Sequence, residues 1–102
     1  MTPPLPSDLF DAAAARFRLL GDPVRLWVLN LLLERGEATV QELAEAMGQS
    51  HQNTSKHLRK LAEAELVAVR RDGAFAYYHV SDASVAGLCL LMCGALRADA
   101  AA

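Results

Sequence analysis

The sequence feature that most constrains the fold is a short helix that stops at a glycine and is followed almost at once by another helix. The segment "TVQELAEAMG" predicts a helix in which Thr39 and Glu42 form a capping box and Gly48 ends the last turn. After a three-residue turn, Ser50 caps a second helix that runs to about residue 64. Two helices joined by so tight a turn predict a helix-turn-helix unit.

The segment before this unit predicts two further helices. Residues 8–20 form the first, with Ser7 as its N-cap, and residues 23–35 form the second. Asp22 caps the second helix, and Pro23 occupies its first position, where a missing N–H costs nothing. Because the second helix is apolar almost all round, we expect it to form the centre of the core.

The period of the hydrophobic pattern changes at residue 66. "LVAVRR" and "AFAYYHV" alternate as strands do, and the dipeptide Asp72-Gly73 between them predicts a two-residue hairpin turn. Pairing across that turn places Arg70, Phe75 and Tyr77 on one face of the hairpin. The opposite face carries Val67, Val69, Ala76, Tyr78 and Val80.

A last helix over residues 82–98 completes the order α-α-α-α-β-β-α. This order predicts a mainly α fold with a β-hairpin wing (α+β), the winged helix-turn-helix. A chain of 102 residues has room for one domain. We expect residues 8–98 to form that domain, between a flexible N-terminus at 1–7 and a flexible tail at 99–102.

Positive charge is concentrated in the middle of a chain whose net charge is −2. Residues 49–73 carry five basic and three acidic side chains, whereas both flanking segments are net acidic. Within this region the run "GQSHQNTSKHLRKL" holds three basic residues and no acid. Solvated surface helices usually mix Glu with Lys, so this run favours a surface that binds a polyanion.

The second helix of the helix-turn-helix unit separates into two faces. One face, which we expect to pack on the core, holds Thr54, Leu58, Leu61 and Ala62. The other face holds Gln52, Ser55, Lys56 and Arg59 at i, i+3, i+4 and i+7. A DNA major groove admits one α-helix, and amide and basic side chains suit the edges of its bases.

The hairpin adds two basic side chains beside its turn. Arg70 and Arg71 suit a wing that follows the DNA backbone or enters the minor groove. The alternative is that they only protect an exposed edge strand from aggregation. The predicted DNA-binding residues are Ser50, His51, Gln52, Asn53, Ser55, Lys56, Arg59, Lys60, Arg70 and Arg71.

The two histidines of the polar run do not indicate a metal site or an enzyme. His51 and His57 are six residues apart and project about 120° from each other on a helix. Pairs of metal ligands on one helix normally lie at i, i+3 or i+4. The sequence shows no paired carboxylates, no nucleophile with an adjacent base and no Gly-rich phosphate loop, so we expect no enzyme.

Four segments carry a family resemblance over about residues 9–97. They are "LLGDPVRLWVLNLL", "VQELAEAMGQSHQNTSKHLRKL", "AELVAVRRDGAFAYYHV" and the closing apolar helix. Together they resemble the ArsR/SmtB family of bacterial transcriptional repressors. The resemblance implies a homodimer on operator DNA, joined through the first and last helices. It also implies that in many members a metal ion or a thiol-reactive signal releases the DNA.

The composition of the last helix independently favours a dimer. The helix is apolar almost all round, and one small domain cannot cover every side of a terminal helix. A symmetric partner would cover it, and two copies would present two recognition helices to a palindromic site. The predicted dimer-interface residues are Phe10, Phe17, Val85, Cys89, Met92 and Leu96.

The family's familiar metal sites are absent from this sequence, because Ser84 replaces the His of the Asp-x-His zinc pattern and the third helix lacks a Cys-x-Cys pair. Cys89 and Cys93 remain, at i and i+4 of the last helix. They fit a site for As(III) or another soft thiophilic ion with a third ligand from elsewhere. They also fit a redox-sensing pair, and free cysteines are often plain core residues.

A broader alternative is a winged-helix module that serves protein contacts only and senses no inducer. The acid-free helix face and the arginines of the hairpin favour the DNA-binding regulator over this module. The sequence shows no secretory signal and no run of 18 apolar residues. We therefore expect a cytoplasmic protein with no membrane partner.

Overall fold

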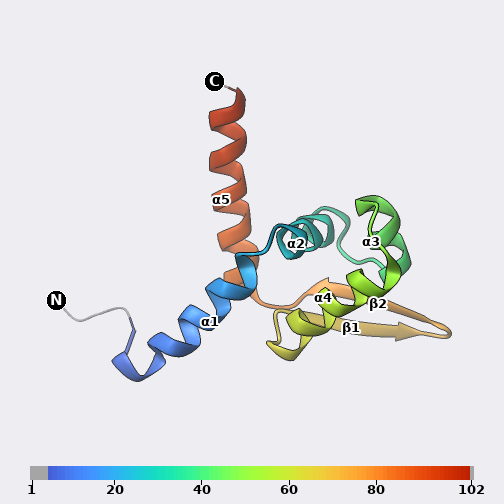
Figure 1. Cartoon of the computed structure of the whole chain (residues 1–102), viewed down its shortest axis with the longest axis horizontal. Coiled ribbons are helices and arrows are strands. Elements are labelled where there is room, and N and C mark those ends of the chain that lie inside the picture. The colour runs from blue at the N-terminus through green and yellow to red at the C-terminus, as the bar shows by residue number, and fades with distance from the viewer. Residues whose placement is uncertain (1–4, 102) are drawn as a thin grey trace.

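The computed structural model describes residues 5–101, which form a winged helix-turn-helix in the predicted order. The mainly α fold with a β-hairpin is therefore confirmed (Figure 1). The elements are a 3₁₀ turn at Ser7–Leu9, α1 (Phe10–Leu20), α2 (Pro23–Arg35), α3 (Val40–Met47), α4 (His51–Glu63), β1 (Val67–Asp72), β2 (Phe75–Val80) and α5 (Ala83–Ala101).

Side-chain caps set the ends of the central helices as predicted. Asp22 accepts two free backbone N–H groups in the first turn of α2, at 2.9 and 3.1 Å. Thr39 and Glu42 form the capping box of α3, and Gly48 ends that helix in the left-handed conformation with φ 63°. Ser50 Oγ then accepts a backbone N–H at the start of α4, at 3.0 Å. Each boundary is thus fixed by hydrogen bonds between near neighbours in sequence.

Two outer helix ends differ from prediction. Ser7 is the first residue of a 3₁₀ turn rather than an N-cap, and within the described chain no side chain caps that turn or α1. The last helix continues to Ala101, beyond the predicted end at residue 98. The alanines at its end sustain it because alanine has the highest helix propensity. Residues 99–101 are therefore helical; residues 1–4 and 102 lie outside the described part.

The hairpin has the predicted faces but a different turn. Asp72 pairs with Phe75, so the two-residue loop is Gly73-Ala74 rather than Asp72-Gly73. Positive φ at Gly73, and not at Ala74, is the pattern of a II′ turn. Each residue of β1 therefore pairs two residues further along β2 than predicted, for example Arg70 with Tyr77 instead of Phe75. Because a shift of two residues keeps the alternation of a strand, every side chain stays on its predicted face. Arg70, for example, still shares a face with Phe75.

The core lies where α2 crosses the helix-turn-helix unit. Val28, Leu29 and Leu32 of α2 are fully buried or nearly so, which confirms α2 as the central helix. The helix-turn-helix unit and the loop after it supply further residues of this cluster. They contribute Leu43, Met47, Leu58, Leu61 and Leu66.

The first and last helices extend away from this core (Figure 1). α5 contributes only Val85 and Cys89 to the buried set, and the rest of the helix projects outward. By length and composition alone α5 is also apolar enough to cross a membrane, with a mean hydropathy of 1.4 and 11% of that window buried. The two helices therefore leave a large apolar surface uncovered in a single protomer.

Candidate nucleic-acid interface

The outward side of α4 gathers the predicted base-contacting residues around one shallow hollow. Gln52, Lys56 and Arg59 are exposed, and Ser55 between them is half-buried. Lys60 lies outside the hollow but is also exposed on α4. The hollow is lined by Ser50, His51, Gln52, Asn53, Ser55, Lys56 and Arg59.

The opposite side of α4 fixes the helix against the core. Thr54, Leu58 and Leu61 are completely buried, as the pattern predicts. Thr54 is satisfied in this position, because its Oγ1 donates to the Ser50 carbonyl at 2.9 Å. These three buried side chains fix the rotation of α4 about its axis, so the polar side chains on the opposite side of the helix face solvent.

The start of α4 is suited to bind a negative group. The first turn contains no acidic residue, and the free N–H groups of a helix start attract anions such as phosphate. Asn53 is already engaged there, since its Nδ2 donates to Gln49 Oε1 at 2.9 Å. That bond ties the turn to the helix and leaves Gln52 as the less restrained amide of the pair.

His57 does not lie on the hollow with His51. Its Nδ1 is 3.3 Å from Nη1 of Arg25, which belongs to α2. Burial lowers the pKa of His57 below its usual value, and the neighbouring Arg25 acts in the same direction. The prediction that the two histidines do not share a ligand site is consistent with this placement, because His51 is exposed and His57 faces α2.

The two arginines of the hairpin have different surroundings. Arg70 makes a two-pronged ion pair with Glu37, at 2.8 and 3.1 Å, and its guanidinium lies 4.7 Å from the centre of the Tyr77 ring. This pairing lowers the pKa of Glu37 and raises that of Arg70. Arg71, on the other face, has no ion-pair partner among residues 5–101. Arg71 is therefore the better placed of the two for phosphate.

The loop before α3 holds the hairpin in position. Ala38 and Tyr78 exchange two backbone hydrogen bonds, at 2.8 and 3.1 Å, so the loop pairs with the free edge of β2. The Glu37–Arg70 pair adds a side-chain link beside them. The wing is thus joined to the helix-turn-helix unit on its α3 side.

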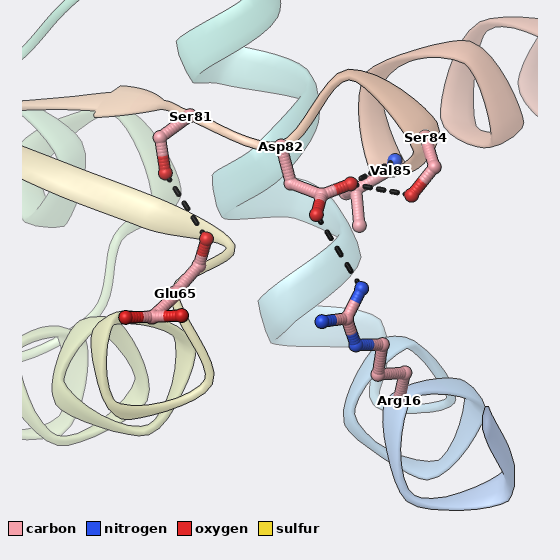
Figure 2. Close-up of polar contacts among 6 residues, drawn as sticks. All are labelled: Arg16, Glu65, Ser81, Asp82, Ser84 and Val85. Carbon is pink, nitrogen blue, oxygen red and sulfur yellow. Dashed lines mark hydrogen bonds and ion pairs between the residues drawn. The ribbon is translucent and has the colours of Figure 1, made fainter. Parts of the chain in front are cut away.

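A polar cluster joins α1 to the start of α5, shown in Figure 2. Asp82 caps α5 by accepting the backbone N–H of Val85 at 3.0 Å and the hydroxyl of Ser84. Its second oxygen is 3.4 Å from the guanidinium of Arg16 in α1. The hydrogen bonds, and to a lesser degree Arg16, lower the pKa of Asp82. Asp82 is therefore occupied by protein partners at the base of both projecting helices.

The predicted dimer-interface residues divide into two groups. Val85 and Cys89 are each 3% exposed and belong to the core of the protomer, so they have little surface to offer a partner, and their interface contacts stay a prediction. The sequence does not distinguish them from the outward residues, because a helix that is apolar on every side does not show which side faces the core. The outward group consists of Phe10, Phe17, Met92 and Leu96, all more than half exposed.

Comparison with known proteins agrees with this geometry. The Helix-turn-helix domain family matches residues 20–70. A probable mercury resistance operon repressor of Streptomyces lividans is 42% identical over 92 residues, which are 90% of this chain and 72% of the relative. The chain belongs to the ArsR family. The members of this family are transcriptional regulators, not enzymes, and the expected winged helix-turn-helix regulator is confirmed.

Two further relatives of this ArsR-family chain show how far the likeness extends. The HTH-type transcriptional regulator KmtR of Mycobacterium tuberculosis is 42% identical over 82 residues, 80% of this chain and 62% of KmtR. The solution structure of Mb0332 from Mycobacterium bovis, described as a homodimeric winged helix-turn-helix DNA-binding domain and a possible ArsR-family regulator, is 29% identical. It superposes with a TM-score of 0.79 over 94% of this chain and 91% of the solved fragment of Mb0332, residues 1–100.

The cysteines of this ArsR-family chain lie beside an apolar hollow between the projecting helices. Cys89 is buried and Cys93 is partly exposed one turn later. Burial raises the pKa of Cys89, and Cys93 adds to that effect. In the described residues no third His, Cys, Asp or Glu completes a metal cluster. The hollow is lined by Phe17, Leu20, Gly21, Leu26, Leu88, Cys89, Met92, Cys93 and Leu96.

Three side chains in this interface were not anticipated from the sequence. They are Arg25, Glu37 and Arg16, each of which contacts a partner more than 30 residues away. A charged side chain carries no sequence signal for so distant a partner. Only for Arg25 does the sequence suggest a contact with another helix, because this charged residue lies in the first turn of a helix whose interior is apolar.

Proposed function

We propose that this chain is a homodimeric, sequence-specific DNA-binding repressor of transcription that acts in the cytoplasm. The observation that carries the proposal is the exposed side of α4, where Gln52, Lys56 and Arg59 project from a helix that is acid-free up to Glu63. Amide side chains suit adenine and guanidinium groups suit guanine, so these residues would contact bases in the major groove. Arg71 and the start of α4 would hold phosphates.

Dimerisation is supported by the uncovered surface of α1 and α5. Phe17, Met92 and Leu96 are 59 to 63% exposed on helices that extend from the core, and Mb0332 is described as homodimeric. In a twofold dimer these surfaces would cover one another. The two copies of α4 would then reach successive major grooves, about 34 Å apart, of a palindromic operator.

A DNA-selection experiment tests the binding surface. The full chain would select duplexes from a randomised pool, and fluorescence anisotropy would give the affinity for the enriched palindrome. Gln52→Ala and Arg59→Ala should each weaken binding to that palindrome by at least about thirtyfold, because each bidentate base contact is worth about 1–3 kcal/mol and occurs twice in a symmetric dimer.

Arg35→Ala, which removes an exposed charge at the far end of α2, is the matched control. Its affinity should stay close to that of the wild type. Failure to enrich any duplex would refute the DNA-binding proposal and favour the protein-interaction module. Equal losses in all three variants would refute the assignment of the α4 face.

We further propose that a soft thiophilic ion or a thiol oxidant releases the DNA through Cys89 and Cys93. A mercury resistance repressor is among the similar proteins, and thiolates are the ligands that soft ions such as As(III) prefer. Because these two thiols form no larger cluster within the described protomer, a bound ion would need a further ligand from elsewhere, for example from the partner subunit.

Titration of the DNA complex tests this signal. As(III), Hg(II), Cd(II), Zn(II) and a polysulfide would be added separately to wild-type protein and to the Cys89→Ser/Cys93→Ser double variant. The effective agent should release DNA from the wild type alone. If no agent releases the DNA, or if the double variant responds equally, the two cysteines serve only as packing residues.

A further inference from the structure

Arg25 lies at the junction of three helices. It belongs to the first turn of α2, and its Nε donates to the Leu19 carbonyl in the last turn of α1, at 2.7 Å. Its Nη1 is 3.3 Å from Nδ1 of His57, in the middle of α4. One side chain therefore contacts both the helix that projects from the core and the helix that carries the polar face.

The contact of Arg25 with α1 is a hydrogen bond from a charged donor to a carbonyl at the end of a helix. The last carbonyls of an α-helix lack partners within the helix, and a cation beside them also meets the negative end of the helix dipole. The Arg25 guanidinium supplies both the missing donor and the favourable charge for Leu19. The contact therefore holds the end of α1 against the start of α2.

The contact with α4 requires a neutral histidine. A guanidinium group only donates hydrogen bonds, so Nδ1 of His57 must be the acceptor and the ring proton must be on Nε2. A second proton would occupy Nδ1, remove the acceptor and place two positive charges 3.3 Å apart. Protonation of His57 therefore breaks the Arg25–His57 hydrogen bond, which is the polar link between α2 and α4.

The charged groups around His57 mostly oppose that protonation. Burial and the charges of Arg25, Lys60 and Lys56 disfavour the imidazolium, whereas Asp22 at the start of α2 favours it. The neutral ring thus prevails near neutral pH, and acidification supplies the proton.

We propose that Arg25 is a positioning residue that couples the projecting helix α1 to the recognition helix α4 through neutral His57, so that acidification weakens DNA binding. The proposal rests on the proposed function for its DNA readout. A change in the angle of α1 would move Arg25, and with it the central turn of α4. Conversely, release of His57 would remove the polar link between α4 and the helix that carries the exposed Phe17, while the apolar anchors of α4 stay in the core.

The test measures DNA affinity from about pH 8 to about pH 5.5 at constant ionic strength, over the range in which histidine titrates. Wild-type protein should bind the selected palindrome about tenfold more weakly at the acidic end, the cost of one hydrogen bond to a charged group. His57→Asn places an amide oxygen near the Nδ1 position, so it should keep the affinity and lose the pH dependence. His57→Leu should bind weakly at every pH.

Two comparisons separate this coupling from other titrations. His79→Asn, in the hairpin, should keep the wild-type pH dependence. His51 cannot mimic the effect, because a proton on the DNA-facing side of α4 would strengthen binding to phosphate. A pH dependence that persists in His57→Asn, or its absence from the wild type, would overturn the proposal.

A DNA-free measurement distinguishes failure of the coupling from failure of the proposed function. Two-dimensional NMR would follow the His57 ring and the backbone amides of residues 17–20 during the same titration. In the wild type both sets of signals should shift with one midpoint, and in Arg25→Gln the α1 amides should stop responding. If the α1 amides ignore His57 in the wild type, the coupling is absent whether or not the protein binds DNA.

Discussion

Replacement of Phe17 by alanine should greatly weaken dimerisation of the chain. Phe17 is 63% exposed in a single protomer and lies beside Leu20 and Leu88 at the mouth of the hollow between α1 and α5. Complete burial of a phenylalanine side chain is worth about 1.5–3 kcal/mol, so burial of its exposed part is worth about 1–2 kcal/mol. Each contact occurs twice in a symmetric dimer.

The expected loss is therefore about 2–4 kcal/mol, which raises the dimer dissociation constant about thirtyfold to a thousandfold. Sedimentation equilibrium over a range of concentrations measures that constant directly. Phe75→Ala is a close control, because Phe75 is the same residue type, is 61% exposed and lies on the wing instead. Its dissociation constant should match the wild type.

Two results would refute this reasoning. A wild-type chain that stays monomeric at high concentration would mean that the surface of α1 and α5 is not a dimer interface. A dissociation constant that changes by less than about threefold in Phe17→Ala would mean that the partner covers other parts of these helices. Circular dichroism of each variant would check that the fold is retained.

Three further outcomes follow from the contacts described above. Arg71→Ala should weaken binding to all DNA sequences alike and lower the salt slope of the dimer by about 1.8, because each of the two subunits loses one phosphate contact. Arg70→Ala should lower it less because a carboxylate already compensates its charge; anisotropy across salt concentrations measures both. Glu65→Gly, just after the end of α4, should raise stability in urea by up to about 1 kcal/mol because it relieves a left-handed residue. Lys60→Gly, inside α4, should lower stability by about 1 kcal/mol. Stability should fall as pH falls below about 6.5, because the unfolded chain protonates His57 more readily than the folded chain does; an increase over that range would contradict the lowered pKa.

The Glu65 prediction depends on the way α4 ends. The backbone of Glu65 has φ 61°, a left-handed conformation that residues other than glycine seldom adopt. The Leu66 N–H donates back to the Leu61 carbonyl at 2.9 Å, and the Glu65 N–H donates to Ala62 at 3.0 Å. This is the hydrogen-bond pattern of a Schellman motif, in which glycine is the usual residue.

The features that the sequence predicts correctly are those decided over a few residues. The capping box from Thr39 to Glu42, the stop at Gly48 and the cap at Ser50 each join groups within one helical turn. The buried stripe of α4 is equally local, because Leu58 and Leu61 recur with the helical period. These signals suffice to place the polar face of the recognition helix.

The features that the sequence misses depend on packing between distant segments. Arg70 resembles Arg71 in the sequence, and only the pairing with Glu37, 33 residues away, separates their surroundings. The hairpin turn was displaced because both Asp72-Gly73 and Gly73-Ala74 place a glycine within the loop. The burial of Cys89 in the protomer is not evident from the sequence, because the pattern of an apolar helix does not show which side packs against the core.

Cys89 is buried and Cys93, one turn later, is more accessible, so the reactivity of the Cys89 thiol can report local opening of α5. An alkylating reagent can reach Cys93 in the folded protomer, but it meets Cys89 only when the base of α5 lifts from the core. In a Cys93→Ser background, the labelling rate of Cys89 relative to that of a free thiol therefore gives the free energy of that opening. The same rate, measured with and without DNA, would show how firmly DNA holds the protomer closed.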